Sequence, residues 1–103
     1  MSVKVIIERK FKEAPLPENF QVINKLRGGA IQQKGYVTGE TLVNCEDNYV
    51  VVLSTWASLD DWRTWSGSQD RAELEKELTP HLKEPLKTRL FITGADYIKE
   101  AFV

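Results

Sequence analysis

The chain has 103 residues, of which 42% are hydrophobic and 28% are charged, and its net charge is -1. This length and composition are typical of one globular domain with a single core, and they exclude a disordered or fibrous protein. The 14 basic and 15 acidic residues are spread evenly and form no basic stripe for phosphates, so nucleic acid is not an expected partner. We therefore expect one domain over residues 1–103.

Membrane and metal partners are not expected either. The longest apolar run, Val50 to Leu53, is far shorter than the ~20 residues of a membrane span, and the N-terminus lacks the apolar stretch of a signal peptide. The cytoplasm is therefore the expected location. Cys45 is the single cysteine and His81 the single histidine. A disulfide or a metal site built only from this chain is not predicted.

The first part of the chain predicts a strand followed by a helix. Residues 2–11 alternate between apolar and polar side chains, with Arg9 on the apolar side, and this period of two predicts a strand. The prolines at residues 15 and 17 end it. A helix ending near residues 33–35 is then predicted by an apolar stripe that consists of Phe20, Ile23, Leu26 and Ala30.

Residues 36–44 and 49–56 are rich in β-branched and aromatic residues and predict a hairpin, with residues 45–48 as its loop. The second of these strands is apolar on both faces, so we expect it to be central and covered on both sides. Ser58 and Asp61 then form a capping pattern. A helical segment broken at residues 66–68 is predicted over residues 59–83, followed by a strand over residues 86–93.

This order, β-α-β-β-α-β, predicts an α+β ferredoxin-like domain with an antiparallel sheet. Both helices of such a domain cover one face of the sheet, and the doubly apolar strand needs cover on the other face. We expect a second copy of the chain to supply it. The apolar residues of the tail, 97–103, are expected to dock on that partner subunit.

Four features together resemble a known family. Gly35-Tyr36 opens the second predicted strand, Trp56 ends the third, and the helix that begins after Ser58 carries Trp65. With the segments YVTGETL at 36–42 and VVVLSTWASLDDWRTW at 50–65, this pattern is similar to the antibiotic biosynthesis monooxygenase family over nearly the whole chain. The resemblance implies a homodimer with packed sheets, a dimeric α+β barrel, and a mainly apolar pocket between sheet and helices.

The resemblance also implies a chemistry. Some members of this family oxidise phenolic or quinol-like substrates without metal or flavin, using an aromatic enclosure and hydrogen bonds to the developing anion. A related branch binds and degrades haem through an asparagine, a tryptophan and a histidine. Trp65 matches the tryptophan, but Arg9 stands near the asparagine place and Glu75 near the histidine place. Haem is therefore disfavoured, and no cofactor is expected.

The tryptophans Trp56, Trp62 and Trp65 are candidates for the wall of a pocket that stacks on an aromatic substrate, with Tyr36 and Tyr49 as further lining. Core packing of the tryptophans, and packing of the tyrosines at the sheet edge, are the alternatives. Trp65 is the strongest candidate because it matches a family position.

His81 and Arg9 are, with Trp65, the candidate catalytic residues. His81 has a side chain with a pKa suited to proton removal from a phenol, and a surface role is the alternative. Arg9 is predicted either to hold a substrate anion or to pair with Glu8, Glu40 or another acid.

The function predicted from these residues is a homodimeric, cofactor-independent monooxygenase that acts on a small aromatic compound, such as a phenol or quinol. The alternative is a non-catalytic dimeric module that binds a small apolar ligand or has a structural role. Haem binding is a third hypothesis for the function. The sequence leaves open whether the chain is an enzyme.

Overall fold

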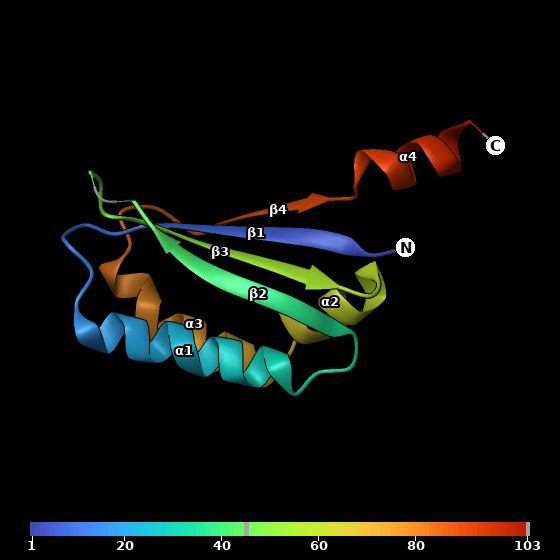
Figure 1. Cartoon of the computed structure of the whole chain (residues 1–103). Helices are drawn as coiled ribbons and strands as arrows, with labels where there is room; N and C mark the ends of the chain where they lie inside the picture. Colours follow the sequence, from blue (N-terminus) through green and yellow to red (C-terminus); the bar gives the residue numbers. More distant parts are fainter. Residues whose placement is uncertain (45, 103) are drawn as a thin grey trace.

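The computed structural model describes residues 1–44 and 46–102 (Figure 1). Cys45, in the predicted hairpin loop, lies outside the described residues. The elements are, in chain order, β1 (Val3–Lys10), α1 (Pro17–Ile31), β2 (Tyr36–Val43), β3 (Tyr49–Trp56), α2 (Leu59–Ser66), α3 (Gln69–Leu78), the 3-10 helix η1 (Thr79–His81), β4 (Lys87–Phe91) and α4 (Gly94–Ala101).

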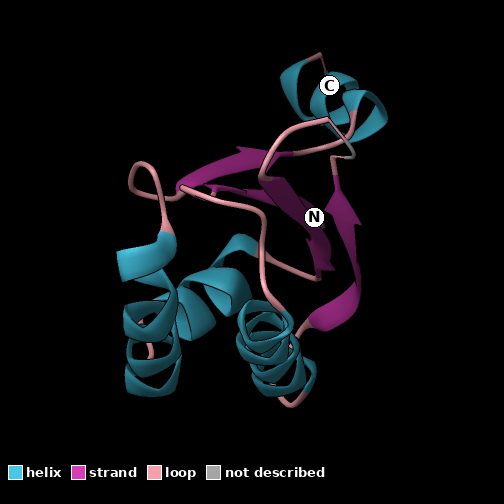
Figure 2. Cartoon of the chain, turned by 90° about the vertical axis from the view of Figure 1, so that its left-hand side faces the viewer, coloured by secondary structure: helices cyan, strands magenta, loops and turns pink. Residues whose placement is uncertain are grey.

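The four strands form one antiparallel sheet in the order β2-β3-β1-β4. The central strands β1 and β3 pair along their whole length, with Ile7 opposite Val52. The helices α1, α2 and α3 cover one face of this sheet, and α4 lies on its other side (Figure 2). The predicted α+β ferredoxin-like arrangement is confirmed.

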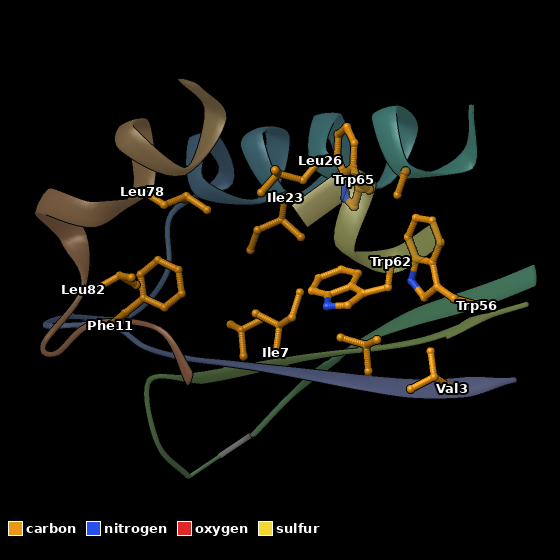
Figure 3. Packing of buried hydrophobic residues seen from close by; sticks show 13 residues of the cluster. Val3, Ile7, Phe11, Ile23, Leu26, Trp56, Trp62, Trp65, Leu78 and Leu82 are labelled. Atoms are coloured by element: carbon orange, nitrogen blue, oxygen red, sulfur yellow. The ribbon is translucent and has the colours of Figure 1, made fainter. Parts of the chain in front are cut away.

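Alternation along β1 decides which face becomes the core. Val3, Val5 and Ile7 are buried towards the helices, whereas Lys4 and Lys10 are exposed. The same alternation places Arg9 among the buried side chains, as predicted. Aliphatic residues of α1 and α3 and the tryptophans of β3 and α2 complete the core above this face (Figure 3).

Two serine caps break the second helical segment. The Ser58 hydroxyl accepts a hydrogen bond from the Asp61 N–H at 3.1 Å and starts α2. The Ser68 hydroxyl accepts one from the Arg71 N–H at 3.2 Å and starts α3. These bonds satisfy amides that a helix start leaves unpaired. The broken segment predicted over residues 59–83 is therefore α2, α3 and η1.

The face of the sheet opposite α1, α2 and α3 is called the outer face here. It carries Ile6, Val51 and Leu53, which are half-buried, between the exposed side chains of Leu42 and Phe91. Within the described part of the chain, β3 is therefore covered by helices on one face only. Its predicted second cover would have to come from another molecule.

The tail forms a helix that the sequence analysis did not predict. The Thr93 hydroxyl accepts a hydrogen bond from the Asp96 N–H at 3.1 Å and starts α4. Ile98 and Phe102 are 60% and 74% exposed, so the apolar side of this helix has little cover. No helix among residues 1–44 and 46–102 is long and apolar enough to cross a membrane.

Candidate functional site

A hollow lies between the sheet and the helices α1, α2 and α3, and its lining includes Arg9, Tyr36, Trp56, Trp62, Trp65 and Arg71. We call it the inner cavity. It encloses about 40 Å³ of free space and is open to solvent at its mouth. This is well below the volume of about 300–1,000 Å³ that is usual for small-molecule sites. A small ligand therefore enters through the mouth and requires the lining side chains to move apart.

The walls of the inner cavity are aromatic. The Tyr36 and Trp56 rings meet edge to face with centroids 5.4 Å apart, and the Trp56 and Trp62 rings lie 5.7 Å apart at an interplanar angle of 64°. Trp56 also donates a hydrogen bond from Nε1 to the Ser54 hydroxyl at 3.1 Å. The structure therefore brings together the aromatic residues that the sequence singled out, with the exception of Tyr49.

Trp65 packs between α2 and α1, where the absence of a side chain makes room for it (Figure 3). A Cβ atom on Gly29 would lie 2.5 Å from Cη2 of the Trp65 ring, whereas a Cβ on the neighbouring Gly28 would meet nothing within 4 Å. Gly29 thus allows the close approach of the indole to the α1 backbone.

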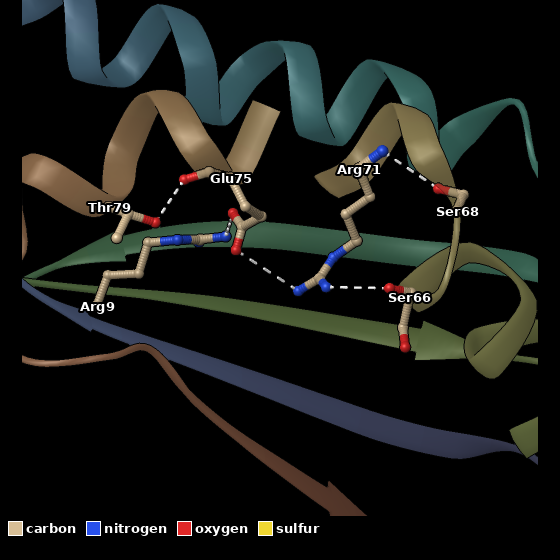
Figure 4. A network of polar contacts seen from close by, with 6 residues as sticks. All are labelled: Arg9, Ser66, Ser68, Arg71, Glu75 and Thr79. Atoms are coloured by element: carbon tan, nitrogen blue, oxygen red, sulfur yellow. Dashed lines mark hydrogen bonds and ion pairs between the residues drawn. The ribbon is translucent and has the colours of Figure 1, made fainter. Parts of the chain in front are cut away.

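A buried ion cluster lies at one end of the inner cavity and consists of Arg9, Arg71 and Glu75 (Figure 4). Arg9 is 2% exposed and donates from Nη2 to Oε1 of Glu75. Arg71 Nη2 lies 3.7 Å from Oε2 of Glu75, and Arg71 Nη1 donates to the Ser66 carbonyl oxygen at 3.4 Å. The acid that pairs with Arg9 is therefore Glu75, not Glu8 or Glu40.

Arg71 is the cavity residue that sequence reasoning missed. It lies on α3, a polar helix whose residues are typical of a solvated surface. Its guanidinium lies 5.3 Å from the centroid of the Trp62 ring, a cation–π contact. Burial lowers the pKa of Arg71, and the negative charge of Glu75 opposes that shift. The i, i+4 spacing of these two residues was the available signal.

His81 and Tyr49 do not line the inner cavity. His81 is exposed in η1, beside Phe11 and Lys12. Tyr49 lies on the outer face and donates its hydroxyl hydrogen to Glu8, which also accepts a hydrogen bond from Arg89 Nε at 3.0 Å. This bond raises the pKa of Tyr49, and the two donors lower the pKa of Glu8. Neither residue is placed to act on a ligand held by the tryptophans.

The inner cavity does not fit haem. Glu75, near the expected histidine place, is engaged by Arg9, and His81 lies outside the cavity. Among the described residues, no group of three His, Cys, Asp or Glu side chains is arranged to hold a metal ion.

These observations define a ferredoxin-like domain with an aromatic, arginine-bearing cavity under its sheet. No protein-family model and no curated protein matches the sequence. Solved structures do match. SnoaB from Streptomyces nogalater, a cofactor-independent oxygenase, superposes with a TM-score of 0.79 and 19% identity over 89% of this chain and 92% of SnoaB.

Two further structures are similar. An antibiotic biosynthesis monooxygenase gives a TM-score of 0.75 and 16% identity over 88% of this chain and 97% of its own. A conserved protein from Methanosarcina mazei Go1 gives 0.80 and 13% identity over 88% of this chain and 91% of its own. At such identities the likeness concerns the fold. The chain has the fold of the antibiotic biosynthesis monooxygenases, as predicted.

The packing of Trp65 predicts that two adjacent glycines respond oppositely to the same substitution. Gly28→Ala should raise the free energy of unfolding by about 0.5–1 kcal/mol, because alanine favours the helix. Gly29→Ala should lower it by about 1–3 kcal/mol, because the new methyl group overpacks the buried Trp65 ring. Urea unfolding monitored by tryptophan fluorescence measures both. Equal changes in the two variants would contradict the close approach.

Proposed function

We propose that this protein is a cofactor-independent monooxygenase that acts on a small phenol or quinol in the inner cavity. The observation that supports this proposal most is the combination of three tryptophans with two guanidinium groups around one cavity, that of the buried Arg9 and that of Arg71, whose side chain is 13% exposed. The aromatic walls suit a flat ring. The positive charge suits the anion that such a ring becomes when it loses a proton.

The chemistry requires no group beyond the substrate and dioxygen. A phenol bound near Arg71 ionises more readily because a nearby positive charge favours the phenolate. The electron-rich ring passes an electron to dioxygen, a C–O bond forms, and cleavage of the O–O bond releases water. One phenol and one O₂ then give one quinone and one H₂O, so dioxygen supplies both the oxidising equivalents and the inserted oxygen.

The chain's own residues have separate roles in this proposal. Trp56, Trp62 and Trp65 exclude water and hold the ring. Arg71 and Arg9 stabilise the developing negative charge with donors that are already in position. The similarity in fold to SnoaB, which is a cofactor-independent oxygenase, supports the same chemistry for this cavity.

Oxygen uptake with a panel of phenols and quinols tests the activity. We expect uptake that depends on the protein, and a decrease in kcat of about 100-fold in Arg71→Gln, since removal of one preorganised donor typically has this effect. Arg63→Gln is the matched control, because Arg63 is exposed on α2 and does not line the inner cavity. No uptake across the panel, or equal rates in Arg71→Gln and Trp65→Ala and the unmodified protein, would favour the non-catalytic binding module.

We further propose that the working unit is a homodimer formed through the outer face. The support is the apolar strip around Val51 and Leu53 on that face, and the exposed apolar side chains of α4, which lies on the same side of the sheet (Figure 2). Exposed apolar surface of this kind marks an interface. We propose that a second copy of the chain covers the outer face. The apolar strip and α4 lie on the same side of the sheet, so one partner covers both.

Light scattering after gel filtration tests the dimer. We expect twice the chain mass of 11.8 kDa. Leu53→Lys should shift the mass to that of the monomer, because it places a charge in the apolar strip. Gln32→Lys, an exposed change just after α1, should leave the dimer intact. A monomeric unmodified protein at all concentrations would contradict the proposal.

A further inference from the structure

The charges around the inner cavity do not balance. At its border, Arg27 is exposed and donates a hydrogen bond to the Gly39 carbonyl oxygen, whereas the charges of Arg9, Arg71 and Glu75 sum to one positive charge. This cluster is withdrawn from water: the side chain of Arg9 is 2% exposed, and those of Arg71 and Glu75 are each 13% exposed. An uncompensated buried charge destabilises a protein. A negative charge bound in the cavity would offset it.

The cluster also leaves hydrogen-bond donors unused. Arg9 Nε, Arg71 Nη2 and Glu75 Oε2 are buried and have no hydrogen-bond partner among the described residues, although Arg71 Nη2 and Glu75 Oε2 face one another at 3.7 Å. Both arginine side chains line the cavity, and the Glu75 carboxylate lies between their guanidinium groups (Figure 4). Buried polar groups are normally paired, so Arg9 Nε, which has no partner among the described residues, and Arg71 Nη2, which is beyond hydrogen-bond distance of Glu75, indicate a missing acceptor. The lowered pKa of Arg71 agrees with a guanidinium that lacks full compensation.

The unpaired donors adjoin the aromatic wall. The Arg71 guanidinium lies 5.3 Å from the centroid of the Trp62 ring, and Trp62 is in edge contact with Trp56. A ligand whose anionic group reaches Arg71 therefore places the rest of its body against tryptophan. A planar guanidinium pairs best with a planar carboxylate, through two parallel hydrogen bonds.

We infer that the ligand of the inner cavity is an aromatic carboxylate, whose carboxylate group is bound by Arg71 and Arg9 and whose ring lies against Trp62 and Trp56. This inference rests on the proposed function, because it assumes that the inner cavity is the substrate site. It narrows the substrate class to phenols and quinols that carry a carboxylate on the ring. The binding step, however, requires no turnover.

Benzoate and benzamide test the inference, because they share a shape and differ in charge. Neither is a phenol or a quinol, so binding is measured apart from oxidation. We expect calorimetric titration in a low-chloride buffer to give benzoate an affinity about 10- to 100-fold higher than that of benzamide, as hydrogen bonds between charged groups contribute about 1.5–3 kcal/mol. Equal affinities, tighter binding of benzamide, or no binding of either compound would overturn the inference.

Two variants of the cluster have opposite expected effects. Arg71→Gln should abolish the preference for benzoate, and it leaves Glu75 paired with Arg9. Glu75→Gln should tighten benzoate binding about tenfold, because it removes the negative charge that competes with the ligand. A purely structural role of the cluster would weaken binding in both variants, and that result would overturn the inference. Arg63→Gln, at an exposed position of α2 outside the cavity lining, is the control for loss of a positive charge.

The outcomes separate this inference from the proposed function. Selective binding of benzoate without oxygen uptake by any phenol would support the carboxylate site and contradict the monooxygenase. Oxygen uptake with neutral quinols but no selectivity for benzoate over benzamide would support the monooxygenase and contradict the carboxylate site.

Discussion

The buried ion cluster of Arg9, Arg71 and Glu75 is the constraint on which the site depends. The strand β1 places Arg9, because successive side chains of a strand point to opposite faces and the face that buries Val5 and Ile7 also buries Arg9. The other two members of the cluster are placed by the helix break, since the cap at Ser68 sets where α3 begins. A buried guanidinium needs a carboxylate, and Glu75 meets that need only when α3 lies over β1.

The aromatic half of the cavity follows from the same packing. α2 carries Trp62 and Trp65 into the space between the sheet and α1, and the missing side chain at Gly29 lets the Trp65 ring approach the α1 backbone. The tryptophans therefore belong to the core and also line the cavity. The two readings considered for them from the sequence, packing and ligand contact, are compatible. One set of side chains stabilises the fold and shapes the site.

The sequence predicted what local patterns encode. The bounds of β3, the cap of α2, the break before α3 and the inward position of Arg9 all follow from period, capping and turn chemistry. The position of Arg71 in the cavity wall could not be predicted, because its burial depends on the packing of a polar helix against the sheet. α4 was also missed, although the Thr93 cap and the helical spacing of Tyr97, Ile98 and Ala101 were available signals. His81 was chosen by residue type, and tertiary structure places it elsewhere.

The central claim is that the ion cluster serves a ligand and not the fold. Its most direct test is the free energy of unfolding of a triple variant, Arg9→Met, Arg71→Met and Glu75→Leu, measured together with benzoate binding. Replacement of buried ionic groups by apolar residues of similar size is often neutral or stabilising, by about 1–4 kcal/mol. We therefore predict a variant as stable as the unmodified protein, or more stable, that no longer binds benzoate. A loss of several kcal/mol, or unchanged benzoate binding, would contradict the claim.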